Sequence, residues 1–219
     1  MQGVEAATKR PKQKNGGQMT NRIAFQGALG AYSHEACKVA RRRLEPLPCS
    51  TFEDMIGAVI DGRADNAMVP VENSTYGRVA DIHRLLPGSG LHIIDEVFTR
   101  VRICLIANSG TKLKDIKSVR AHVVLLPQAR EFLDQHQIEP IHAADSAGAA
   151  AELALNPDPT SGVLASSIAA KNYSLKILDI IEENKRTSLL HGSCQRESDF
   201  IFSSIHTFIN SCNESLSSL

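Results

Sequence analysis

Short apolar runs alternate with amphipathic stretches along most of this chain. Apolar runs bounded by turn residues are typical of buried strands, and apolar residues that recur every three to four positions are typical of helices. We expect strands at residues 22–25, 67–71, 91–98, 101–107, 119–123, 138–142, 162–165 and 176–181. We expect helices at residues 33–43, 50–60, 127–135, 145–156 and 166–172. Strands that alternate with helices in this way predict an α/β protein with open sheets.

Capping signals support two of these helices. Ser50 and Glu53 have the spacing of a capping box ahead of an apolar helical face. Asp145 or Ser146 is expected to cap the Ala-rich helix that ends near Asn156.

The rhythm of strands and helices restarts near residue 100, which predicts two lobes. Residues 21–190 are expected to form the folded unit, with the second lobe at about residues 100–178. Residues 1–20 are polar and predict a disordered basic tail, and residues 191–219 form an atypical segment with one hint of a strand. The basic cluster of the tail is Lys9, Arg10, Lys12 and Lys14.

Composition and charge narrow the class of protein. Lys+Arg and Asp+Glu both number 24, and Trp is absent, so neither nucleic acid nor a membrane is an expected partner. No apolar stretch reaches the roughly 18 residues of a membrane span, and the N-terminus lacks a secretory signal pattern. The five cysteines are widely spaced and match neither a zinc site nor a disulfide framework. A reducing cytoplasm is therefore the expected compartment.

The candidate chemistry lies where strands end. Glu72, Asn73 and Ser74 follow the expected strand at 67–71, and Gly77 then lets backbone approach a ligand. Ser33 lies at the first strand–helix junction, and Ser166 lies at a similar hydroxyl-rich helix start. Such junctions place backbone N–H groups and short polar side chains around a small anion. The sequence therefore predicts a small-molecule site between the two lobes.

Each of these residues also has a purely structural interpretation. Asn73 and Ser74 favour turns for local reasons, and Ser33 can act as a helix N-cap instead of a ligand. Neither alternative is excluded by the sequence.

Several ordered motifs resemble those of the prephenate dehydratase family. The similarity covers residues 22–183 and is carried by Gly30-Ala31-Tyr32-Ser33, Pro70-Val71-Glu72-Asn73-Ser74 and Asp145-Ser146-Ala147-Gly148-Ala149, followed by Leu164-Ala165-Ser166 with Ala169, Ala170 and Tyr173. The resemblance implies two lobes of the type II periplasmic-binding-protein architecture, with the active site in the cleft between them. It also implies prephenate as substrate and no cofactor or metal, and it leaves a homodimer open.

Two segments depart from the family pattern. Where the family has Ser-His-Pro-Gln, this chain has Ala121-His122-Val123-Val124, so only the histidine is kept. Where the family has Thr-Arg-Phe, the best match is Thr187-Ser188-Leu189. The resemblance assigns Thr187 as the donor that assists loss of the substrate hydroxyl. His122 is a weaker substrate-binding candidate, because a histidine on an apolar strand is equally typical of a core.

The function implied by the resemblance is a cofactor-free, decarboxylating dehydration of prephenate to phenylpyruvate, in phenylalanine biosynthesis. The altered motifs imply a weak rate. A small-carboxylate binding module and an inactive homologue are the alternatives, and prephenate and arogenate both remain candidate substrates. The family's regulatory ACT domain is expected to be missing or truncated, with residues 200–209 as a remnant.

Overall fold

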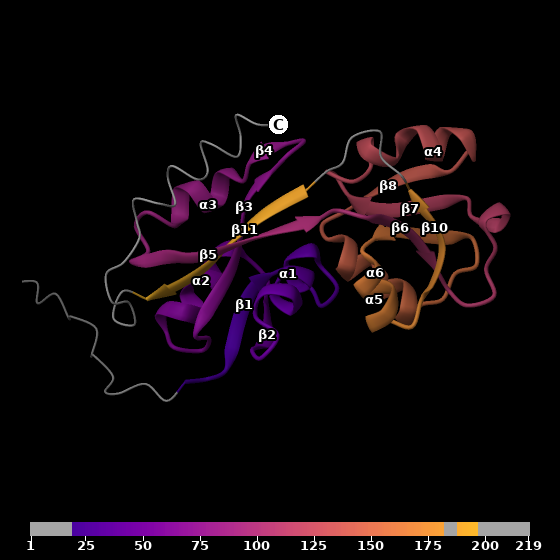
Figure 1. Ribbon diagram of the computed structural model, residues 1–219. Helices are drawn as coiled ribbons and strands as arrows, with labels where there is room; N and C mark the ends of the chain where they lie inside the picture. Colours follow the sequence, from indigo (N-terminus) through magenta and orange to yellow (C-terminus); the bar gives the residue numbers. More distant parts are fainter. Residues whose placement is uncertain (1–18, 182–187, 197–219) are drawn as a thin grey trace, which may run out of the picture.

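The computed structural model describes residues 19–181 and 188–196, and they form two α/β lobes that lie side by side (Figure 1). The first lobe contains β1 (Arg22–Gln26), α1 (Tyr32–Ala40), β2 (Glu45–Cys49), α2 (Phe52–Ile60), β3 (Asn66–Asn73), β4 (Gly77–Arg78), α3 (Ala80–Leu85), β5 (Leu91–Arg100) and β11 (Ser188–Arg196). The second lobe contains β6 (Ile103–Ala107), η1 (Leu113–Asp115), β7 (Ser118–His122), η2 (Pro127–Ala129), α4 (Arg130–Gln135), β8 (Glu139–Ala143), α5 (Ser146–Leu155), β9 (Ser161–Ala165), α6 (Ser167–Asn172) and β10 (Lys176–Ile181).

The two sheets have the same internal order. The first sheet runs β2-β1-β3-β11-β5, with β4 on β3, and the second runs β8-β7-β9-β6-β10. In each sheet three parallel strands are followed by an antiparallel strand that arrives from the other lobe, β11 in one case and β6 in the other. This exchange of one strand is the two-lobed, type II periplasmic-binding architecture, and it confirms the expected fold class.

Helices cover both faces of each sheet, because the central strands are apolar on both sides. In the first lobe α1 packs over Phe25 and Met68, while α2 and α3 cover Ala24 and Val69 on the opposite face. In the second lobe α4 covers one face, around Leu105 and Leu164, and α5 and α6 cover the other. Each lobe is therefore a three-layer sandwich with its own core.

Most predicted elements are confirmed, with differences at their ends. The first helix spans Tyr32–Ala40, and the N-cap of α2 is Thr51, whose side chain accepts a hydrogen bond from the Asp54 N–H, so the prediction of Ser50 as cap was wrong. Asp145 caps α5 through the N–H groups of Ala147 and Gly148.

Five elements were not predicted from the sequence: β2, β4, α3, η1 and β11. Strand β11 runs across the expected domain limit at residue 190 and lies between β3 and β5. The basic cluster of the tail and residues 197–219 fall outside the described residues. Among the helices of residues 19–181, none is long and apolar enough to span a membrane.

Candidate functional site

The carboxyl ends of the parallel strands of both lobes meet at the junction between the lobes. Asp145, which follows β8, accepts a hydrogen bond from the Ala28 N–H, which follows β1, over 3.3 Å. Ser166, which follows β9, donates its hydroxyl to the Gly30 carbonyl. Carboxyl ends of parallel strands are the usual place for ligands in α/β proteins. The residues after β1, β3, β7, β8 and β9 are therefore the candidate site.

Gly30 permits the closest approach between the lobes. A Cβ on Gly30 would lie 2.7 Å from the Ala169 Cα, and its φ of +103° favours glycine. The Gly30 N–H donates to His34 Nδ1 over 3.0 Å, so this nitrogen carries a lone pair. Burial lowers the pKa of His34, and its ring stacks on Phe25. The neutral His34 ring thus fixes the loop that precedes α1.

Ser33 is a buried residue of the first turn of α1 and does not cap the helix. The N-cap is Ala31, which makes no side-chain capping bond. Instead the Ser33 hydroxyl lies 3.1 Å from His191 Nε2 on β11. Ser33 is 8% exposed and His191 is 0% exposed. The sequence identified Ser33 as a candidate, but it gave no sign of its partner.

Burial lowers the pKa of His191 to about 4, although the Leu189 backbone opposes this shift. The ring is therefore neutral at pH 7. His191 Nδ1 has no hydrogen-bond partner among the described residues.

Asn73 and Ser74 build a turn at the end of β3. Asn73 Oδ1 accepts from the N–H groups of Thr75 (2.8 Å) and Tyr76 (3.0 Å), which is the Asx turn that the structural interpretation anticipated. Ser74 exchanges backbone and side-chain bonds with Ser188 at the start of β11. These bonds tie the turn after β3 to the strand that returns from the second lobe.

Glu72 and Asn73 are not on the same face of the sheet. Glu72 pairs with Arg78 and with Leu190, whereas Asn73 pairs with Gly77 and with Leu189. Adjacent strand residues point to opposite faces, and Leu189 packs against the core of the second lobe. Asn73 therefore lies on the face that meets the second lobe, and Glu72 lies on the other.

Gly77 keeps an open position in the turn after β3. Its φ is +77°, and an added Cβ would meet nothing within 4 Å. Close approach of a ligand to the backbone at Gly77 stays a prediction.

His122 lies at the carboxyl end of β7. Its backbone N–H donates to the Ser146 hydroxyl over 2.9 Å, and its Nδ1 accepts from the Val124 N–H over 3.3 Å. His122 is half-buried, so it is neither a core histidine nor a fully exposed one.

Ser166 is the N-cap of α6 as well as an inter-lobe contact. Its oxygen accepts from the Ala169 N–H over 3.1 Å while its hydroxyl donates to Gly30. Thr187, the predicted hydroxyl-assisting donor, lies outside the described residues.

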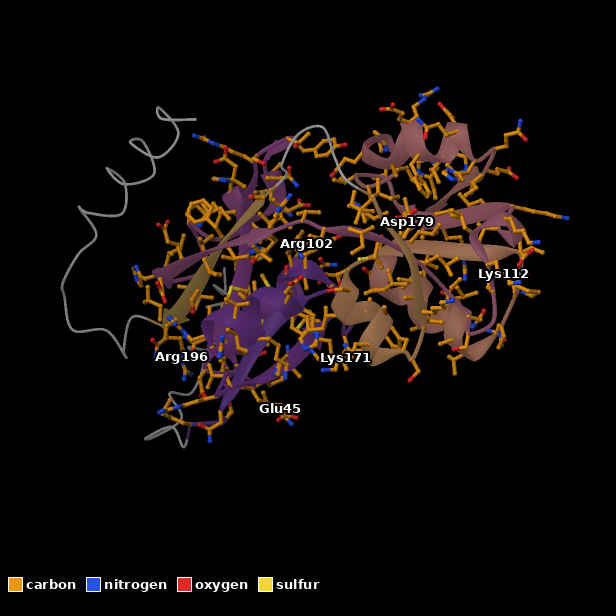
Figure 2. The ribbon with its side chains drawn as sticks, turned by 45° about the vertical axis from the view of Figure 1, so that its right-hand side comes forward. Glu45, Arg102, Lys112, Lys171, Asp179 and Arg196 are labelled. Carbon is orange, nitrogen blue, oxygen red and sulfur yellow. The ribbon has the colours of Figure 1, made fainter. Side chains whose placement is uncertain are left out.

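Positive charge reaches the junction through Arg102, in the connection from β5 to β6 (Figure 2). Burial raises the pKa of Glu35 on α1, and Arg102 opposes this shift. The Arg102 carbonyl accepts from the Tyr32 hydroxyl over 3.1 Å, which fixes the connection against α1. Arg102 is thus an exposed cation in one of the connections between the lobes. The residues described include no cluster of His, Cys, Asp and Glu that could hold a metal ion.

Sequence reasoning missed two residues that the structure places at this junction. Asp145 was identified only as a cap, yet its second oxygen also reaches Ala28 of the other lobe. His191 was missed because its place depends on β11, which no local pattern indicated.

Comparison with known proteins identifies the family. Residues 23–188 match the family model "Prephenate dehydratase". The chain therefore belongs to the prephenate dehydratase family.

Several curated relatives support this membership. The chain is 44% identical over 156 residues to the "Bifunctional N-acyl-homoserine lactone acylase/prephenate dehydratase" of Komagataeibacter europaeus, covering 71% of this chain and 56% of that protein. It is 34% identical over 170 residues to the "Bifunctional chorismate mutase/prephenate dehydratase" of Escherichia coli, covering 75% of this chain and 44% of that protein. The chain spans about half the length of these relatives.

Solved structures show the same fold. The structure titled "GqqA- a novel type of quorum quenching acylases" superposes with a TM-score of 0.77 and 39% identity, covering 83% of this chain and 66% of that one. A prephenate dehydratase from Arthrobacter aurescens in complex with L-Phe has a TM-score of 0.75 and 24% identity, covering 84% of this chain and 63% of that one.

Proposed function

We propose that this protein is a lyase that converts prephenate to phenylpyruvate with loss of CO₂ and water. The observation that supports this most strongly is the match of residues 23–188 to the prephenate dehydratase family. The strand ends of both lobes also lie next to each other, and donors from both lobes could hold a small dianion between them.

Formation of an aromatic ring makes the product strongly favoured. Catalysis of this reaction requires that the substrate is positioned and that hydrogen-bond donors face the departing hydroxyl. Preorganised donors aimed at the departing hydroxyl are the expected source of rate. Thr187 is the proposed donor to that hydroxyl. Ser33, Asn73 and Ser166 are proposed to hold the substrate, with Arg102 supplying positive charge for a carboxylate.

The remaining substrate-binding assignments are proposals of the same kind. Ser74 and Gly77 would shape the turn after β3, and His122 would close the site from the second lobe. Glu72 would act from the opposite face of its sheet, through the turn it precedes. No metal or organic cofactor is needed for this reaction.

The proposed location is the cytoplasm. The four cysteines in the described part of the chain are buried free thiols, and free thiols are typical of a reducing compartment. The proposed ligand is a small carboxylate, and neither nucleic acid nor a membrane is a proposed partner.

Replacement of Thr187 tests the proposed mechanism. Thr187→Ala should lower kcat on the order of 10²-fold with little change in KM, because the donor acts mainly in the transition state. Thr187→Ser keeps a hydroxyl and should retain part of the rate. Formation of phenylpyruvate is followed by absorbance, with Ser109→Ala, an exposed residue of the second lobe, as control. Full kcat in Thr187→Ala would remove Thr187 from the mechanism.

A second candidate function is hydrolysis of an N-acyl-homoserine lactone. It is favoured by the relative from Komagataeibacter europaeus and by the acylase structure, both of which exceed one third identity to this chain. Release of homoserine lactone from a short N-acyl derivative, measured by mass spectrometry, tests it. A rate equal to that of a protein-free sample would remove this candidate.

A further inference from the structure

The Ser33–His191 contact has the geometry of a nucleophile and its base. The two side chains come from segments 158 positions apart, and the Ser33 Oγ lies 3.1 Å from His191 Nε2. This distance falls within the range for a nucleophile paired with a general base. Neither side chain bonds to a third side chain in the described part of the structure, and Ser33 does not cap α1.

The ring of His191 is neutral, as a base must be, although its pKa of about 4 makes it a weak base. It is fully buried and neutral at pH 7, so one ring nitrogen has a lone pair. The Leu189 backbone favours a proton on the ring. A proton on Nδ1 leaves the lone pair on Nε2, which is the nitrogen that faces Ser33.

The position of Ser33 in the helix supplies donors for developing negative charge. Ser33 is the second residue of the nine-residue α1, so the N–H groups of Ser33 and His34 have no intrahelical acceptor. Such N–H groups stabilise an oxyanion when they lie beside the attacked carbonyl. Ser33 also lies at the junction between the lobes, three residues after the Gly30 contact with Ser166.

We propose that Ser33 and His191 form a nucleophile–base pair that hydrolyses a small ester or N-acyl compound at the junction between the lobes. Ser33 Oγ attacks the carbonyl carbon while His191 Nε2 takes its proton. The bond from the carbonyl carbon to the leaving oxygen or nitrogen breaks, and the leaving group receives that proton from Nε2. Water then attacks the acyl-serine by the same route and releases the carboxylic acid. For the class of bond attacked, this inference rests on the second candidate function.

The pair is expected to be a slow catalyst. His191 Nδ1 has no carboxylate partner among residues 19–181 and 188–196 to stabilise the imidazolium. In serine proteases the loss of a correctly acting carboxylate at this position lowers kcat by about 10⁴-fold. Covalent labelling of the serine is therefore a more sensitive readout than turnover.

The test uses the 219-residue chain at pH 7.5 and diisopropyl fluorophosphate, a reagent that phosphorylates activated serines. The tryptic peptide of residues 23–38 contains Ser33 as its single serine, so mass spectrometry locates the adduct without any substitution. We expect an adduct on Ser33 that forms at least tenfold faster than in urea-unfolded protein. An equal rate in folded and unfolded protein, or labelling of folded protein only at other residues, would overturn the proposal.

Two variants separate the base from its surroundings. His191→Gln keeps a polar group of similar reach but cannot act as a base, and it should slow labelling of Ser33 at least tenfold. Ser193→Ala is the matched control, because Ser193 is equally buried on β11 and its hydroxyl has no partner there. It should leave the labelling rate of Ser33 unchanged. Unchanged labelling in folded His191→Gln would overturn the assignment of the base.

The acylase candidate and the pair can fail separately. Labelling of Ser33 without turnover of an N-acyl-homoserine lactone supports the pair and removes that substrate. Turnover of the lactone that persists in Ser33→Ala overturns the pair and leaves the acylase candidate standing.

Discussion

At the scale of single residues, Gly30 determines how closely the two lobes approach. Its backbone has a positive φ, and its missing side chain makes room for Ala169 of α6. Two effects therefore oppose any side chain at this position: backbone strain and a clash with backbone atoms of the other lobe.

Gly30→Ala should lower the free energy of unfolding by about 2–5 kcal/mol, from strain of about 1–2 kcal/mol and overpacking of about 1–3 kcal/mol. Gly90→Ala is the matched control, because Gly90 also has a positive φ but no atom lies within 4 Å of an added Cβ. Gly90→Ala should lower the free energy of unfolding by the strain contribution alone. Urea unfolding measures both, and equal losses would show that the contact with Ala169 does not hold the lobes together.

His191 makes stability depend on pH. Its pKa is lowered from 6.5 to about 4 by burial, so below pH 6.5 the unfolded chain binds a proton that the folded chain does not. Stability is therefore greatest above pH 6.5 and falls as the pH drops toward 4. The shift of about 2.5 pH units corresponds to about 3 kcal/mol.

His191→Gln should remove most of that pH-dependent loss, whatever its effect on stability at pH 7. The measurement is urea unfolding at several pH values between 7 and 4.5, compared between the wild-type protein and the variant. His34, whose pKa is also lowered by burial, remains in both proteins and contributes equally. Parallel pH curves would contradict the buried, neutral state of His191.

At the scale of elements, the N-terminus of α5 links local helix capping to the junction. One carboxylate, Asp145, accepts from two N–H groups of its own helix and from Ala28 of the other lobe. Thr51 is exposed and caps α2 by accepting a hydrogen bond from the Asp54 N–H.

Asp145→Ala should therefore lower the free energy of unfolding more than Thr51→Ala does. Loss of a cap is worth about 1 kcal/mol, and the lost bond to Ala28 adds about 0.5–1.5 kcal/mol. Only Asp145→Ala should also reduce turnover of prephenate, because only it loosens the junction. Thermal unfolding and the phenylpyruvate assay check the two parts, and equal behaviour of the variants would limit Asp145 to capping.

The strands whose apolar runs are buried on both faces, such as β3 and β6, were predicted from the sequence. The edge strand β2 was missed because Pro46 and Pro48 resemble a loop, although prolines are tolerated on an edge strand. The strand β11 was missed because His191 and Ser193 interrupt its apolar pattern. Its position follows from pairing with β3 and β5, which are distant in sequence.

The candidate site was predictable only in part, because it too depends on contacts between segments that are distant in sequence. Strand ends with short polar residues could be recognised locally, and Ser33, Asn73 and Ser166 were found in this way. Their partners could not be recognised, because the bonds from Ser33 to His191 and from Ser166 to Gly30 join segments more than 100 positions apart.

At the scale of the whole molecule, the two lobes are joined by two chain crossings and by the contacts at the strand ends. The crossings are the connections from β5 to β6 and from β10 to β11. Two such crossings permit the lobes to move against each other, while the bonds of Ala28 and Gly30 favour the arrangement seen here. A dianion held between donors of both lobes would stabilise this arrangement further.

The central claim is that the junction between the lobes converts prephenate. The most direct measurement is a proton NMR time course of prephenate with the 219-residue chain at pH 7.5, beside a protein-free sample. We expect phenylpyruvate to appear faster than in the protein-free sample, without added metal. Loss of prephenate at the protein-free rate, with saturable binding detected by calorimetry, would contradict the lyase and leave a small-carboxylate binding module.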